Sequence, residues 1–339
     1  MPATRATPAP MTGDEHLLLN ELITAAIGVS FPEHKREMLE CRLRPRLQAL
    51  RLPTYLDYYF LLQAGSPGEM ERLAELVTNN ETYFFRETAP FEALFDQALP
   101  DLRPGAASPG ALRVLLAGCS SGEEAYTLSI VARQHFVQLA GMALTIDAFD
   151  VDRSRVEAAR RGEYGRISFR ATSAEQLERY FLAATPAPAP APAPMPTPAS
   201  APERWAVRPL LRGGVRFFHG NILDAGSFAA PLAYDAVFCR NVLIYFSEPA
   251  LHRAVDNFAA VLRHGGLLLL GHSESIIGMS PCFATVRLRN LIAYRRTAAV
   301  PPADAGGADG AAAAAIRCGT AGAPAAAPAG GGGGRRFPA

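Results

Sequence analysis

The chain has 339 residues, of which 49% are hydrophobic and 19% are charged, and its formal net charge at pH 7 is +1. These values exclude a disordered chain and give no global electrostatic reason to expect a nucleic-acid partner. The five cysteines are scattered without a C-x-x-C pair, which favours reduced thiols in a cytoplasmic protein over a zinc site. There is no apolar run of about 18 residues and no signal-peptide core, so we expect neither export nor membrane insertion.

Residues 15–88 predict a small all-helical domain, after a disordered start over 1–14. Apolar residues recur at helical spacing over 17–27, 32–50, 54–63 and 69–78, and Gly28 ends the first of these helices. Pro45 should bend or interrupt the second helix. The expected aromatic core of the domain is Tyr55, Tyr58, Tyr59 and Phe60.

The second helix carries more cations than acids, although the whole chain is balanced. A solvated face is the plainer interpretation of such charge, but the local excess supports docking of an acidic partner surface. The cations concerned are Lys35, Arg36, Arg42, Arg44 and Arg46.

Residues 78–87, TNNETYFFRE, join the helical domain to the remainder of the chain. Their Asn, Thr and Arg content beside three aromatic residues is unusual for a linker, which would favour Gly, Ser and Pro. Arg86 could pair with a carboxylate and the amides could complete a polar pocket. A capped helix start with an aromatic hinge explains the segment equally well.

Residues 112–128, LRVLLAGCSSGEEAYTL, predict a buried strand, a glycine turn at 118–122 and a helix from Glu123. The turn lacks the G-x-G-x-x-G fingerprint and the P-loop lysine. It fits either an ordinary α/β connection or a shelf for a nucleotide-like ligand. Glu123 and Glu124 could accept hydrogen bonds from a cationic or hydroxyl-bearing group.

Strand and helix patterns then alternate. Strands are expected at 144–149, 215–218, 234–239 and 267–270, with helices at 153–161 and about 249–262. Such alternation predicts a mostly parallel, doubly wound sheet that binds ligands at the carboxyl ends of its strands. Asp150, at the tip of the second strand, lies where such folds bind ribose hydroxyls. We therefore expect an α/β domain over 89–298.

Two segments fall outside that pattern. Residues 185–202 are a Pro-Ala tract, expected as a stiff, extended insertion. Residues 299–339 are rich in Ala, Gly and Pro, and we expect a disordered tail there.

Four motifs occur in one order along the chain: NNETYFFRE at 79–87, GCSSGEEAY at 118–126, FCRNVLIYF at 238–246 and GHSES at 271–275. Together they resemble the signature blocks of the CheR-type chemotaxis-receptor methyltransferases, over residues 17–294 apart from the Pro-Ala tract. The resemblance implies a Rossmann-like domain that uses S-adenosylmethionine and releases S-adenosylhomocysteine, without a metal. It implies a protein-glutamate O-methyltransferase that forms glutamyl methyl esters on the cytoplasmic methylation helices of chemoreceptors, in chemotaxis signal transduction.

The resemblance also implies the cofactor-binding residues, and their chemistry agrees with that assignment. Arg86 suits the carboxylate of the donor, Asp150 its ribose diol and Asn221 its adenine edge. Glu123 or Glu124 would offset the positive charge of the donor, and the sequence leaves this choice open. The implied set is Asn80, Thr82, Arg86, Glu124, Asp150, Asn221, Ile222, Arg240 and Asn241.

Arg86 and Tyr245 are the candidate catalytic residues, with Tyr245 orienting the acceptor unless it is only a packed aromatic. A glutamate carboxylate is already ionised at pH 7, so in-line methyl transfer needs positioning and exclusion of water but no general base. The resemblance further implies that the helical domain, with its basic second helix, faces the receptor. We expect a monomer with no nucleic-acid partner.

Departures from the family and other functions complete the expectations. The Pro-Ala tract falls where the family places a small β-subdomain that in some members grips a receptor peptide, which brings such tethering into question for this chain. One alternative is a non-catalytic signalling scaffold that binds S-adenosylmethionine. Another is a methyltransferase acting on another protein or on nucleic acid, which would normally show a broad basic surface.

Overall fold

The computed structural model describes residues 8–102, 110–139, 141–184, 204–227 and 234–297. All of them belong to the first of two compact units, residues 1–305. The predicted Pro-Ala insertion, the predicted tail and the first seven residues of the predicted disordered start lie outside the described residues. Among the described residues, no helix has both the length and the apolar character needed to span a membrane.

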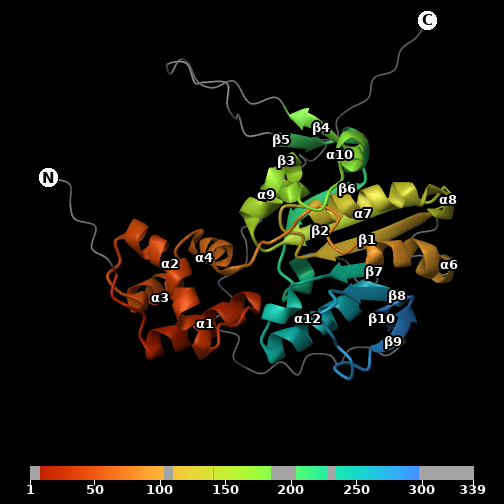
Figure 1. Cartoon of the computed structure of the whole chain (residues 1–339). Helices are drawn as coiled ribbons and strands as arrows, with labels where there is room; N and C mark the ends of the chain where they lie inside the picture. The colour runs from red at the N-terminus through yellow and green to blue at the C-terminus, as the bar shows by residue number, and fades with distance from the viewer. Residues whose placement is uncertain (1–7, 103–109, 140, 185–203, 228–233, 298–339) are drawn as a thin grey trace, which may run out of the picture. The chain divides into compact units, whose positions relative to one another are not determined.

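The N-terminal domain is helical (Figure 1). Its elements are α1 (Gly13–Ile27), η1 (Glu33–Lys35), α2 (Arg36–Leu50), α3 (Tyr55–Gln63) and α4 (Glu69–Val77). Gly28 ends α1 in the left-handed conformation that glycine adopts without strain. The domain has its own apolar core, whose members include Leu19, Ile23, Phe31, Leu39, Leu43, Leu47, Tyr55, Tyr58 and Leu73.

The predicted disordered start is wrong for residues 8–14. Thr12 caps α1 by accepting from the Glu15 backbone N–H, and the Glu15 carboxylate accepts from the Thr12 N–H at 2.8 Å, which is a capping box. The Met11 side chain is buried in the helical core, and its N–H donates to Glu40 at 3.1 Å. These contacts order a segment that composition alone suggested was free.

Two further expectations about this domain are corrected. Helix α2 continues through Pro45 to Leu50, because Cys41 and Pro45 are both exposed and water can bond the Cys41 carbonyl that loses its helical partner. Phe60 is 59% exposed and not part of the core. Helix α3 buries the face that carries Tyr55 and Tyr58, and Phe60 lies off that face.

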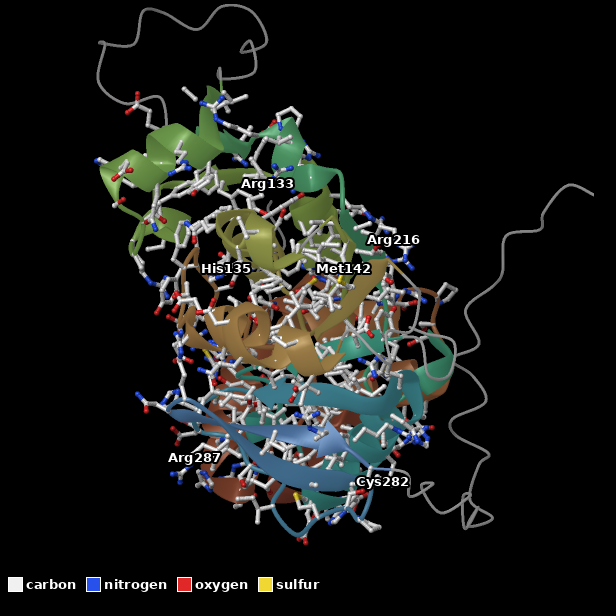
Figure 2. All side chains as sticks on the ribbon, turned by 90° about the vertical axis from the view of Figure 1, so that its right-hand side faces the viewer. Arg133, His135, Met142, Arg216, Cys282 and Arg287 are labelled. Atoms are coloured by element: carbon white, nitrogen blue, oxygen red, sulfur yellow. The ribbon has the colours of Figure 1, made fainter. Side chains whose placement is uncertain are left out.

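A seven-stranded sheet forms the second domain, in the order β6-β2-β1-β7-β8-β10-β9. The strands are β1 (Ala111–Ala117), β2 (Ala143–Asp150), β6 (Val215–His219), β7 (Tyr234–Cys239), β8 (Leu262–Leu270), β9 (Phe283–Leu288) and β10 (Leu291–Arg296). The first five in spatial order pair in parallel, whereas β10 pairs antiparallel with both β8 and β9. Arg216 on β6 and Arg287 on β9 mark its two edges (Figure 2).

Helices cover both faces of this sheet (Figure 1), which explains why its strands read as continuous apolar runs. Val114 and Leu116 of β1 pack in the cluster that includes residues of α7 (Glu123–Gln134), whereas Leu115 and Ala117 pack in the cluster that includes residues of α12 (Glu248–Val261). The helices around the sheet are α5 (Ala89–Ala93), the π-helical η2 (Leu94–Ala98), α6 (Leu99–Leu102), α7 (Glu123–Gln134), α8 (Phe136–Leu139), α9 (Arg153–Arg161) and α12 (Glu248–Val261).

A second, three-stranded antiparallel sheet has the order β3-β5-β4. Its strands are β3 (Glu163–Gly165), β4 (Phe181–Ala184) and β5 (Arg204–Val207), beside η4 (Arg166–Phe169), α10 (Ala174–Tyr180) and α11 (Pro209–Arg212). The Pro-Ala tract runs from β4 to β5 along the chain, so this sheet forms from residues on either side of the tract. The tract therefore does not take the place of a small β-sheet in this chain.

The helical domain depends on a buried carboxylate, Glu69, at the start of α4. It accepts from Arg46 Nε at 2.8 Å and from the Tyr58 hydroxyl at 2.9 Å. We predict that Glu69→Gln lowers the free energy of unfolding by roughly 2 kcal/mol, since it leaves Arg46 without its counter-charge.

Urea unfolding followed by circular dichroism measures this change. Glu21→Gln, at an exposed position of α1, is the matched control and should stay within about 0.5 kcal/mol of the parent protein. Equal unfolding midpoints for the Glu69 variant and the parent would contradict the assignment.

Candidate functional site

The site lies at the carboxyl ends of β1, β2, β6 and β7, where parallel strands deliver their following loops to one edge. The strand order reverses between β1 and β7, so the loops after these two strands diverge and leave a crevice. Gly118, with a φ of 79°, begins the β1 loop, and a Cβ there would come within 2.5 Å of Val242 in the β7 loop. Glycine is therefore required where the two loops approach.

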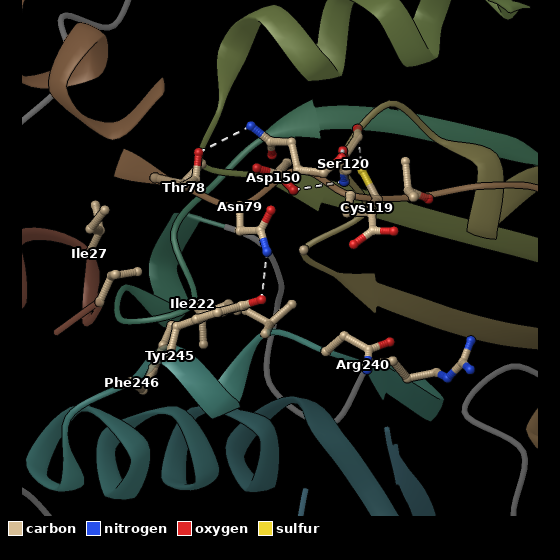
Figure 3. A pocket seen from close by; sticks show the side chains of 18 of the residues that line it. Ile27, Thr78, Asn79, Cys119, Ser120, Asp150, Ile222, Arg240, Tyr245 and Phe246 are labelled. Carbon is tan, nitrogen blue, oxygen red and sulfur yellow. Dashed lines mark hydrogen bonds between the residues drawn. The ribbon is translucent and has the colours of Figure 1, made fainter. Parts of the chain in front are cut away.

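A cavity of about 210 Å³ occupies this edge. It is lined from both domains: from the helical domain by Phe31, Lys35, Met38, Arg42 and Thr78, and from the α/β domain by the loops that follow the strands. Of the implied cofactor residues, every one lines it: Asn80, Thr82, Arg86, Glu124, Asp150, Asn221, Ile222, Arg240 and Asn241. Tyr245 lines it too (Figure 3). The structure thus brings together residues that are up to 161 positions apart (80 to 241).

Asp150 anchors the β1 loop as well as facing the cavity (Figure 3). Its carboxylate accepts from the Ser120 N–H at 2.7 Å and from the Asp152 N–H at 2.9 Å. Burial raises the pKa of Asp150 to about 6, and the two backbone donors oppose that rise. Ser120 has a φ of 46°, a conformation that the Asp150 contact helps to hold.

The segment 78–87 is fixed by an aromatic anchor as well as by polar contacts. Phe84 is fully buried and packs on Tyr164, Phe169 and Phe181 of the small-sheet region. Arg86 is half-buried at the cavity and donates to the Glu81 carbonyl at 3.0 Å. The segment thus contributes polar groups to the cavity and a buried aromatic anchor, whereas the expected capped helix start is wrong, because the helix that begins at Ala89 has no side-chain cap from Thr88.

The Arg240 side chain makes more contacts within the protein than the sequence indicated. Its side chain is 1% exposed and its guanidinium pairs with Glu87 at 2.9 Å and with Glu124 at 3.3 Å. It also donates to the Arg86 carbonyl at 3.3 Å and lies over the Phe91 ring. These bonds make Arg240 hold the cavity wall together, while its buried Nε has no hydrogen-bond partner among the described residues.

Glu123 and Glu124, at the start of α7, face different surroundings. Glu124 lines the cavity, and burial raises its pKa while Arg240 opposes that rise. Glu123 is not among the residues that line the cavity, and its carboxylate accepts from the Ser121 and Ser168 hydroxyls at 2.8 and 2.9 Å. Two successive helical residues point about 100° apart, which separates their roles.

The Asn221 side chain is also engaged within the protein. Its amide donates to the Ala26 carbonyl of α1 at 2.7 Å, and its side-chain oxygen accepts from the Leu223 N–H at 3.0 Å. A second amide N–H and a second lone pair of that oxygen stay available at the cavity, so the expectation that Asn221 and its neighbours read an adenine edge stays a prediction. The neighbouring Ile222 offers an apolar surface to the cavity.

Tyr245 and the loop before it were only partly anticipated. The Tyr245 hydroxyl accepts from the Asn79 amide at 2.6 Å (Figure 3). The loop from Asn241 to Ile244 is bonded to the Glu274 carboxylate, a residue that sequence reasoning missed. The GHSES motif was the available signal, since it places Glu274 three residues after a glycine at the end of β8.

The five cations predicted to dock the receptor, on η1 and α2, differ in what they contact. Lys35 and Arg42 line the cavity, and Arg42 donates to the Thr78 carbonyl at 3.2 Å. Arg36 and Arg44 are the solvent-facing members, paired with Glu33 and Glu40. Arg46 is bound to Glu69 inside the helical domain, so the prediction that all five cations form one docking face is wrong for Arg46.

The residues present fit S-adenosylmethionine. Carboxylates at Glu124 and Asp150 suit a cationic ligand with hydroxyl groups, and Arg86 suits a carboxylate. Phe149 and Ile222 supply apolar wall for a ring. Among the described residues, no group of three His, Cys, Asp or Glu side chains is arranged to hold a metal ion.

Comparison with known proteins gives the same answer. Residues 15–78 match the family description "CheR methyltransferase, all-alpha domain", and residues 80–292 match "CheR methyltransferase, SAM binding domain". Chemotaxis protein methyltransferase 1 of Pseudomonas aeruginosa is 32% identical over 282 residues, covering 82% of this chain and 96% of the relative. The chemotaxis protein methyltransferase of Klebsiella aerogenes is 33% identical over 282 residues, covering 83% and 90%.

A third relative carries a different name. The probable biofilm formation methyltransferase WspC of Pseudomonas aeruginosa is 33% identical over 284 residues, covering 83% of this chain and 61% of that protein. The family matches span both domains, and the cavity gathers the residues that the motifs implied. The chain therefore belongs to the CheR methyltransferase family and is an S-adenosylmethionine-dependent methyltransferase of the chemotaxis protein methyltransferase type.

Proposed function

We propose that this enzyme methylates glutamate side chains on the cytoplasmic methylation helices of chemoreceptors, as a cytoplasmic monomer. The names of the relatives support a chemotaxis substrate. The observation that carries the proposal is the shared cavity, which joins the donor-side residues Arg86, Glu124 and Asp150 to Lys35 and Arg42 of the helical domain. An anionic side chain entering from the helical domain would meet these two cations.

The lining of the cavity supports a carboxylate acceptor. A hydroxyl or amine acceptor must lose a proton during methylation and profits from a general base, most often histidine. No histidine is found among the described residues that line the cavity. A glutamate carboxylate is ionised at neutral pH and can attack directly, so orientation and exclusion of water are the tasks left to the protein.

The chain's residues would share those tasks. S-adenosylmethionine, when bound, supplies an activated methyl group on its sulfonium. Arg86 would hold the carboxylate of this donor, Asp150 its ribose hydroxyls, and Glu124 would balance its positive charge. Asn80, Thr82 and Asn241 would complete the polar wall.

Tyr245 is proposed to orient the acceptor. Because its oxygen accepts from Asn79, the hydroxyl proton is left to donate to a carboxylate in the cavity. The donated bond would fix one carboxylate oxygen and turn the other toward the methyl group. Lys35 and Arg42 would favour entry of that carboxylate electrostatically.

The direct test is transfer of radiolabel from S-adenosylmethionine to membranes that contain the organism's chemoreceptors. We expect base-labile label in the receptors, as glutamyl methyl esters require. Arg86→Ala should lower donor affinity by roughly 10- to 100-fold, since a charge-assisted bond is lost. A protein that binds the donor tightly and labels no receptor would show that the proposed substrate is wrong.

The raised pKa of Asp150 predicts a pH dependence of donor binding. With a pKa of about 6 in the free enzyme, the carboxylate is protonated below that value and loses capacity to accept from ribose hydroxyls. Affinity for S-adenosylhomocysteine, measured by calorimetry, should therefore fall as the pH drops from 7.5 to 5, by about tenfold for each pH unit below the midpoint.

Asp150→Asn is the control for this step. It removes the titrating group but leaves Glu124, so the part of the pH dependence that disappears belongs to Asp150. Equal affinities of the parent protein at both ends of that pH range would contradict the assignment.

The exposed cations of the second helix predict salt-dependent docking. Reversing two of them, in Arg36→Glu with Arg44→Glu, should raise the KM for receptor by roughly tenfold at low salt, with the difference shrinking near 0.5 M salt. Steady-state methylation at both salt concentrations measures the effect. Arg153→Glu, an exposed reversal on α9, is the control, and unchanged KM in the double variant would refute docking on this face.

A further inference from the structure

One carboxylate, that of Glu274, collects five backbone N–H groups. Oε2 accepts from Gly271 at 2.7 Å and Asn241 at 2.9 Å. Oε1 accepts from Val242 at 2.9 Å, Leu243 at 2.8 Å and, more weakly, Ile244 at 3.4 Å. Both oxygens are thus directed at the backbone of the loop that follows β7.

Four of these donors, at residues 241–244, precede or begin η6 (Leu243–Tyr245), a single 3-10 turn, whereas Gly271 follows β8. Successive backbone N–H groups that converge in this way create a site for an anion. Asn241 has a φ of 59°, an uncommon conformation for a residue other than glycine, and the Glu274 bonds compensate for its cost. The shape of the loop therefore depends on a side chain 33 residues further along the chain.

The loop held in this way carries cavity residues. Asn241, Val242 and Tyr245 all line the cavity. From the opposite side, the Tyr245 carbonyl accepts from the Ser30 N–H at 2.9 Å, and the Asn79 amide reaches its hydroxyl. Tyr245 is thus bonded to Ser30 and Asn79 and directly follows the four residues, 241–244, that Glu274 holds.

The surroundings of Gly271 also show that the Glu274 carboxylate fills the space beside this residue. A Cβ at Gly271 would lie 2.7 Å from Glu274 Oε2 and 3.0 Å from the Asn241 nitrogen. Distances this short force the carboxylate or the loop to move. No other side chain fits at residue 271 while Glu274 keeps its bonds.

We propose that Glu274 is a positioning residue for methyl transfer: it sets the 241–245 loop so that Tyr245 presents its hydroxyl to the acceptor. The proposal rests on the proposed function, because it takes Tyr245 as the acceptor-side group. Most of the donor-side residues stand on other elements, namely the 78–87 segment, α7 and β2. Loss of Glu274 therefore disturbs the acceptor side more than the donor side.

The test compares Glu274→Gln with the parent protein. The amide nitrogen of the variant would face a backbone N–H group, and because both are donors, part of the loop would be released. Displacement of a reacting group by about 1 Å lowers the rate on the order of 100-fold. We therefore expect kcat for receptor methylation to fall at least about tenfold, while the Kd for S-adenosylhomocysteine changes less than about fivefold. Glu248→Gln, exposed at the start of α12, is the matched control and should match the parent.

Gly271→Ala is the second variant, because it displaces the carboxylate while keeping its charge. It should reproduce the split between kcat and Kd, whereas Gly213→Ala, where a Cβ would meet nothing within 4 Å, should not. Unchanged kcat in either Glu274→Gln or Gly271→Ala, or a loss of donor affinity as large as the loss of kcat, would overturn the proposal.

Hydrogen–deuterium exchange over residues 240–246 keeps the proposal testable if a variant fails to fold or if receptors are not the substrate. In the parent protein these amides should be protected well beyond an open loop, and Glu274→Gln should release them while the strands of the sheet stay protected. Rapid exchange of these amides in the parent protein would refute the hold of Glu274 on the loop. Absence of receptor methylation, by contrast, would refute the proposed function and leave that hold intact.

Discussion

The buried guanidinium of Arg240 is the interaction on which the donor side of the cavity depends. Removing a charge from water is costly, and the cost is met only where counter-charges and acceptors surround it. Arg240 finds Glu87, Glu124 and the Arg86 carbonyl. These belong to the interdomain segment and to the start of α7, while Arg240 directly follows β7, so a single side chain joins three separate pieces of chain around the place where the donor would lie.

Two carboxylates hold loops of the cavity by accepting hydrogen bonds from backbone N–H groups. Asp150 holds the β1 loop through Ser120, and Glu274 holds the β7 loop through Asn241 and its successors. Both loops contain a non-glycine residue at positive φ, at Ser120 and Asn241. Strained turns of this kind persist where the surroundings supply strong acceptors, and here that strain coincides with the cavity.

The two domains meet through backbone contacts at the acceptor side. Residues 28–30 bond to residues 245–247, and Asn221 bonds to the last turn of α1. The helical domain is therefore part of the site as well as the proposed docking surface, because it places Lys35 and Arg42 on the cavity wall and bonds Tyr245 through Ser30 and Asn79. A receptor helix bound there would lie beside the group proposed to orient its glutamate.

The sequence by itself determined the local elements, because apolar periodicity and glycine turns are encoded in neighbouring residues. It predicted the parallel sheet and the Gly118 turn, and the resemblance of its motifs to the family implied the residues that line the cavity, from Asn80 to Asn241. Only the tertiary structure decided which polar groups are already bonded. In the folded protein Arg46 pairs with Glu69, the Asn221 side chain bonds the Ala26 carbonyl and Glu274 bonds the β7 loop. Hydrogen-bond partners that are far apart in the chain are decided by the packing of whole elements, and spacing along the sequence does not record that packing.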